Sequence, residues 1–63
     1  MTVAERLVQA RGDKRRDEVA SAVGISLSAI SMYENGERIP RDEIKIRLAD
    51  YFGCTVQELF FSP

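Results

Sequence analysis

The side chains of this sequence that could do chemistry are mainly cationic. Lys14, Arg15 and Arg16 form an uninterrupted basic triplet, and Arg38 and Arg41 flank a turn further along the chain. A run of like charges is commonly a solvated helix start, but it can also form one positive face on a nearly neutral protein. The chemistry to expect from such a face is the binding of an anionic partner.

Catalysis and metal binding have no comparable candidates in the sequence. The 63 residues include no histidine and a single cysteine, Cys54, which excludes a structural zinc site, a histidine-based triad and an internal disulfide. No acid and base pair is arranged for proton transfer, and so short a chain cannot enclose a substrate. We therefore expect no enzyme activity, no metal and no cofactor, and we expect Cys54 to be a small buried hydrophobe.

Length and composition indicate one small globular domain spanning residues 1–63. Hydrophobic residues make up 44% of the chain and charged residues 30%, which is ordinary for a folded domain. The formal net charge of −1 argues by itself against a nucleic-acid binder, so the distribution of the cations matters more than their total. No apolar run reaches the ~18 residues that span a bilayer, and no signal peptide is recognisable, so we expect a cytoplasmic location.

Five short helices and no strand are predicted. Thr2 and Glu5 form a capping box that starts a first helix, which ends near Gly12. A second helix runs from about Arg15 to Val23. The apolar positions predicted to face inward from these two helices are Ala4, Leu7, Val8, Val19, Ala20 and Val23.

The remaining three helices also have local start and stop signals. Ser26 is predicted to cap a third helix, with Ile25 and Ile30 as a hydrophobic staple, and this helix ends at Asn35-Gly36. A fourth helix follows Pro40 and runs to about Phe52, with Ile44, Leu48 and Tyr51 on one apolar line and Ile46, Ala49 and Phe52 on an adjacent one. A second capping box, Thr55 with Glu58, starts a short last helix that directs Val56, Leu59 and Phe60 inward.

The most informative unit is residues 16–35, which form two short helices joined by the turn Gly24-Ile25-Ser26. Ala20 lies where the two helices cross, and a larger side chain there would push them apart. Gly24 permits a backbone conformation that is costly for residues with a Cβ. Rigid docking of the two helices lets the second one protrude and enter a DNA major groove, which is about 12 Å wide.

These residues resemble the Cro/C1-type (XRE-like) helix-turn-helix regulators of phages and bacteria. The resemblance rests on Glu18-Val19-Ala20-Ser21-Ala22-Val23-Gly24-Ile25-Ser26, on Ile30-Ser31-Met32-Tyr33-Glu34-Asn35-Gly36 and on the ending from Gly53 to Phe60. It implies a compact, all-α, lambda-repressor-like domain of five helices. It also implies a transcriptional regulator, a repressor in our interpretation, that binds a palindromic double-stranded operator as a homodimer.

By position, the resemblance implies that the recognition helix runs from Leu27 to Glu34. The base-contacting residues would be Leu27, Ser28, Ser31 and Met32. Serine hydroxyls discriminate little between bases, and apolar side chains can contact only the thymine methyl. We therefore expect modest base discrimination, with A·T preference or DNA shape contributing more of the selectivity.

The resemblance also implies contacts to the phosphate backbone on either side of that helix. The implied residues form a strip along the protein surface, which Lys45 can extend. They are Arg15, Arg16, Asn35, Gly36, Arg38 and Arg41. Each cation that neutralises a phosphate releases a counterion and steepens the salt dependence of binding.

One departure from the family pattern concerns Glu34. The loop Gly12-Asp13-Lys14 is one residue longer than usual, and this shift places Val8 where relatives carry an arginine that pairs with the glutamate of the third helix. Glu34 is therefore predicted to lack its usual partner. It must either bond another donor, such as Gln9 or a backbone N–H, or remain solvated.

Two features leave room for protein partners. Phe60 should complete the core, whereas Phe61 has little core left to enter, and together they are the predicted dimer interface. Apolar Leu27 and Met32 on the recognition helix, with the acidic charge balance, also fit an alternative function. That alternative is a protein-interaction module on the same fold, such as an antirepressor or an antitoxin.

Overall fold

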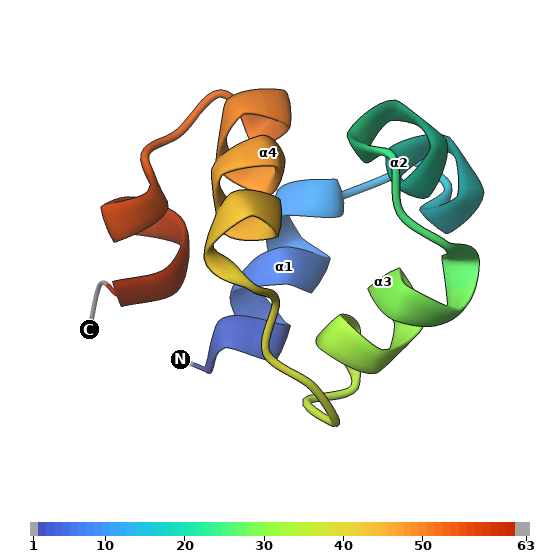
Figure 1. Cartoon of the computed structure of the whole chain (residues 1–63), viewed down its shortest axis with the longest axis horizontal. Coiled ribbons are helices and arrows are strands. Elements are labelled where there is room, and N and C mark those ends of the chain that lie inside the picture. The colour runs from blue at the N-terminus through green and yellow to red at the C-terminus, as the bar shows by residue number, and fades with distance from the viewer. Residues whose placement is uncertain (1, 62–63) are drawn as a thin grey trace.

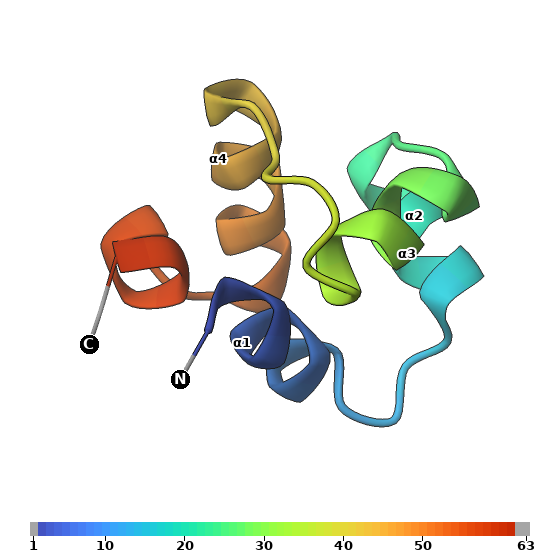
Figure 2. The same cartoon turned by 90° about the horizontal axis from the view of Figure 1, so that it is seen from below.

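The computed structural model describes residues 2–61 and contains the five predicted helices (Figure 1). They are α1 (Val3–Arg11), α2 (Arg16–Val23), α3 (Leu27–Glu34), α4 (Asp42–Phe52) and the short π-helix η1 (Gln57–Phe61). No strand occurs among residues 2–61, so the all-α prediction is confirmed. In both views α1 and α4 lie between η1 on one side and the pair α2 and α3 on the other (Figures 1 and 2).

Side-chain caps start three of the segments as predicted. In the first capping box, the Glu5 backbone N–H donates to Thr2 Oγ1 at 3.2 Å and the Thr2 N–H donates to Glu5 Oε1 at 2.9 Å. Thr55 and Glu58 repeat this exchange at 3.0 and 2.9 Å. These backbone hydrogen bonds lower the pKa of both glutamates. Ser26 accepts from the Ala29 N–H at 3.0 Å and so begins α3.

A single apolar core holds the helices together. Val19 on α2 and Leu48 on α4 have no exposed surface and lie at its centre. The other buried apolar residues are Leu7, Ala20, Val23, Ile30, Tyr33, Ala49, Leu59 and Phe60. Every helix contributes to this set, which fixes α3 on α1 and α2 and thereby sets the direction of its outer face.

The turn between α2 and α3 has the predicted geometry. Gly24 adopts the left-handed conformation with φ of 83°, which a side chain would strain. The backbone N–H groups of Gly24 and Ile25 both donate to the Ala20 carbonyl at 2.9 Å. Ala20 itself is 3% exposed, as expected for a residue at a close helix crossing. This turn sets how α3 leaves α2.

Two expectations about the apolar faces were wrong. Val8 is 41% exposed, because it points about 100° away from its neighbour Leu7 around α1, and Leu7 faces the core. Ile46 on α4 is 53% exposed, while Ala49 and Phe52 on the same predicted line pack against the core. The apolar stripe of each helix is therefore narrower than the spacing of hydrophobic residues predicts.

The last helix also differs from expectation in its winding. Its i→i+5 winding makes it wider than an α-helix. The consecutive residues Leu59 and Phe60 are both buried, at 4% and 6% exposure, while Phe61 emerges at 58%. The inward direction predicted for Leu59 and Phe60 is thus confirmed.

Truncating the centre of the core should destabilise the fold strongly. We expect Leu48→Ala to lower the free energy of unfolding by about 3 kcal/mol, because it leaves a cavity in a well-packed core. Leu27→Ala is the matched control, since the same chemical change at a 51% exposed residue should alter stability by less than about 0.5 kcal/mol. Urea unfolding followed by circular dichroism measures both, and equal losses would contradict the described core.

Candidate nucleic-acid interface

The outer face of α3 carries the four residues predicted to contact bases. Leu27 is 51% exposed and Ser28 is exposed, whereas Ser31 and Met32 are half-buried. The opposite face of the helix is buried through Ile30 and other core residues. The structure therefore offers the first turn of α3 most fully to a partner, and the second turn in part.

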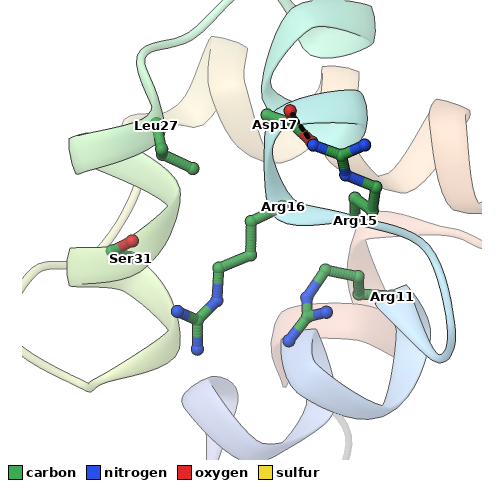
Figure 3. A pocket seen from close by; sticks show the side chains of 6 residues that line it. All are labelled: Arg11, Arg15, Arg16, Asp17, Leu27 and Ser31. Atoms are coloured by element: carbon green, nitrogen blue, oxygen red, sulfur yellow. Dashed lines mark hydrogen bonds and ion pairs between the residues drawn. The ribbon is translucent and has the colours of Figure 1, made fainter.

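A surface hollow of about 460 Å³ lies beside this face, between α3 and the start of α2 (Figure 3). It is lined by Arg11, Arg15, Arg16, Asp17, Leu27 and Ser31. Figure 3 shows the side chains of Arg11 and Arg16 extending side by side toward the same end of the hollow, while Arg15 turns to Asp17. The helix-turn-helix thus places cations next to the exposed residues of α3.

Glu34 was predicted to lack its usual arginine partner and either to bond another donor or to remain solvated. Its side chain is 1% exposed, so it is not solvated, and it pairs with two arginines. Arg11 donates from Nε to Oε2 at 2.7 Å and from Nη2 to Oε1 at 3.1 Å, and Arg16 donates from Nε to Oε1 at 3.0 Å. Within residues 2–61, neither Gln9 nor a backbone N–H donates to the Glu34 carboxylate. In relatives the arginine of this pair stands at the position of Val8, whereas here Arg11, the last residue of α1, takes its place. The longer loop therefore does not remove the pair between α1 and Glu34.

Arg11 also holds that longer loop in place. Its Nη1 donates to the Lys14 carbonyl at 2.9 Å, so all three nitrogens of the guanidinium are used inside the protein. The hydrogen bonds to Glu34 raise the pKa of Arg11 above its ordinary value. Arg11 is therefore a structural residue that joins α1, the loop and α3.

The basic triplet does not act as one patch. The Lys14 ammonium lies 4.8 Å from the centre of the Tyr51 ring on α4, in a cation–π contact. Arg15 is 79% exposed and pairs with Asp17 at 2.9 Å, an exposed contact of little energetic weight. Arg16, 47% exposed, is directed toward α3. Both arginines are predicted to contact phosphate. Arg16 is held in a defined position by Glu34, whereas Arg15 is held only by its exposed pair with Asp17.

The loop after α3 supplies the remaining predicted phosphate contacts. Gly36 has a left-handed backbone with φ of 76°, and the turn begins where the Asn35 N–H donates to the Ser31 carbonyl. All four predicted residues of this loop are exposed, namely Asn35, Gly36, Arg38 and Arg41. These four residues are therefore accessible to a partner, and their contact with phosphate stays a prediction.

Lys45 does not extend this strip. It is 15% exposed, and its ammonium lies 5.7 Å from the Phe60 ring centre and 4.9 Å from that of Phe61. Phe61 and the exposed Ile46 border a second hollow of about 470 Å³ on the α4 and η1 side, which Val56 and Asp42 also line. Lys45 thus belongs to this apolar surface and not to the cationic one.

Three further features of the described residues concern metal ligands, the cysteine and membrane insertion. No group of three His, Cys, Asp or Glu side chains within residues 2–61 is placed to hold a metal ion. Burial raises the pKa of the half-buried Cys54 thiol, which keeps it in the unreactive protonated form. None of the helices between residues 2 and 61 has the length and apolar character to cross a membrane.

Comparison with known proteins places these observations in a family. A family model described as helix-turn-helix matches residues 4–59. The chain is 34% identical over 61 residues to the cryptic phage CTXphi transcriptional repressor RstR of Vibrio cholerae. This alignment covers 94% of the chain but 54% of the repressor, so the chain spans about half the length of that relative. The likeness therefore concerns the five-helix unit.

Removing Arg11 should cost far more stability than removing its exposed neighbour. We expect Arg11→Ala to lower the free energy of unfolding by about 3 kcal/mol, because it breaks a buried ion pair and frees the loop. Arg15→Ala is the control and should change stability by less than about 0.5 kcal/mol. Thermal and urea unfolding measure both. A near-neutral Arg11→Ala would show that Arg16 alone satisfies Glu34.

Proposed function

The chain belongs to the Cro/C1-type helix-turn-helix family of DNA-binding transcriptional regulators, and on that premise we propose how it acts. The proposed function is sequence-selective binding of double-stranded DNA, with α3 in the major groove. The observation that carries this proposal is the exposed first turn of α3 beside a hollow lined by three arginines. A protruding helix reads bases, and flanking cations position it by contacting phosphates.

The chemistry of α3 sets the kind of selectivity we propose. Ser28 and Ser31 can donate to or accept from several base edges, and Leu27 can contact a thymine methyl. None of these side chains forms the two parallel hydrogen bonds that arginine makes to guanine. Base contacts by Leu27, Ser28, Ser31 and Met32 should therefore discriminate modestly, and groove shape should add to the selection.

The regulatory outcome that we propose is repression. The relative over 61 aligned residues is a transcriptional repressor by name, and a bound α3 would occupy the operator and exclude the polymerase. Arg16, Arg38 and Arg41 would contribute most of the sequence-independent affinity by displacing counterions from the phosphates. Arg15, Asn35 and Gly36 would add further backbone contacts.

We further propose that two copies associate through the α4 and η1 surface. Phe61 is 58% exposed and also lines the hollow beside Ile46, so two copies related by a two-fold axis can each place this ring against the other. Phe60 is buried in its own chain and cannot contact a second copy, so of the two residues predicted for the dimer interface we retain only Phe61. η1, which carries Phe61, lies on the side of α4 away from α2 and α3 (Figure 1), so pairing through Phe61 would leave both recognition helices free.

Selection from random duplex DNA at low salt tests the function. We expect an enriched motif with two half-sites about 34 Å apart, one turn of DNA. Ser28→Ala should change the preference at one base pair, whereas Arg41→Ala should weaken all sequences alike and reduce the salt slope by about one. Recovery of no motif would contradict sequence-selective binding. A stoichiometric protein partner without DNA retardation would favour the interaction-module alternative.

Sedimentation tests the proposed dimer. Phe61→Ser should shift the protein toward monomer, because it removes the largest exposed apolar group from the self-complementary surface. Val8→Ser removes a 41% exposed apolar side chain from α1 and is the control that should leave association unchanged. If both variants sediment like the wild-type protein, the second copy does not bind at Phe61.

A further inference from the structure

We propose that Glu34 is a positioning residue for DNA binding, which orients Arg16 so that its terminal nitrogens face a phosphate. The inference rests on the proposed DNA-binding function and adds a role for a residue that itself contacts no DNA. It follows from the unequal way in which two arginines share one buried carboxylate.

Arg11 is committed to contacts inside the protein through each nitrogen of its guanidinium group. Its Nε, Nη1 and Nη2 all donate hydrogen bonds within the protein, two of them to Glu34 and one to the Lys14 carbonyl. Its side chain is 17% exposed. Arg11 therefore binds the carboxylate in a bidentate arrangement and stabilises the fold.

Arg16 contacts the same carboxylate by one atom only. Its Nε donates to Glu34 Oε1 at 3.0 Å, and among the hydrogen bonds within residues 2–61 none engages its Nη1 or Nη2. The side chain is 47% exposed and lines the hollow together with Ser31 (Figure 3). The paired terminal nitrogens are the edge of a guanidinium that binds two phosphate oxygens in parallel.

The charges of the cluster permit this second interaction. Two guanidinium groups meet one carboxylate, so the cluster keeps a net positive charge. Because Glu34 is buried and already held by Arg11, it is a rigid anchor for Arg16. An arginine held in one rotamer loses less conformational freedom when a phosphate binds. Arg15, paired with exposed Asp17 on the surface, has no such anchor.

The first experiment separates orientation from charge. The probe is a fluorescently labelled duplex of mixed sequence at low salt, and the readout is its dissociation constant. We expect Arg16→Lys to weaken binding about tenfold, nearly as much as Arg16→Ala, because an ammonium cannot bond Glu34 and also present two parallel donors. Arg15→Lys is the control, and the loss should be less than about twofold because Arg15 is not oriented by a buried group.

The second experiment tests whether the effect passes through Glu34. Glu34→Gln keeps the shape of the side chain but removes its charge. In that background, adding Arg16→Ala should weaken binding by less than about threefold, against about tenfold in the wild type, because Arg16 is no longer oriented. If Glu34→Gln does not fold, the comparison of Arg16→Lys with Arg15→Lys decides alone.

The possible failures are distinguishable. If the wild-type protein binds the duplex and Arg16→Lys binds equally well, Arg16 acts as a simple charge and the positioning role is refuted while DNA binding stands. Equal losses from Arg16→Ala in both Glu34 backgrounds would refute it in the same way. If the wild-type protein does not bind the duplex, the proposed function fails and the inference fails with it.

Discussion

The arrangement of the candidate interface depends on the burial of one carboxylate. Glu34 ends α3 at 1% exposure, and a buried acidic group is costly unless charged or polar partners satisfy it. The partners here come from the end of α1 and the start of α2. One side chain therefore joins three helices, and the angle at which α3 leaves the body of the protein is set by this contact as well as by apolar packing.

The same interaction explains how a chain with a net charge of −1 can present a positive surface. Arg11 and Arg16 are held beside α3 by Glu34, while several acidic groups are used to begin helices or to pair locally. Lys14 and Lys45 instead contact aromatic rings, that of Tyr51 on α4 and that of Phe61 on η1. Local charge, and not the total, is what an anionic partner meets.

The two exposed surfaces have different chemistry and lie apart. The surface at α3 combines short polar side chains with arginines, whereas the surface at α4 and η1 is apolar around Phe61 and Ile46. The two hollows share no lining residue, and α1 and α4 separate η1 from α2 and α3 (Figure 1). This separation is compatible with a regulator that pairs through one surface and contacts DNA through the other.

The helices, their capping residues and the turn at Gly24 are predictable from the residue order, because they depend on contacts within a few residues. Thr2 with Glu5 and Thr55 with Glu58 are each three positions apart, so their hydrogen bonds follow from spacing alone. The partners of Glu34 lie 23 and 18 positions away, so they follow from the packing of the helices and not from local spacing. Those contacts depend on how far an arginine reaches across the angle between packed helices. For the same reason Val8 and Phe61 are exposed while their neighbours Leu7 and Phe60 are buried, since the exposure of a side chain depends on which neighbouring helix covers it.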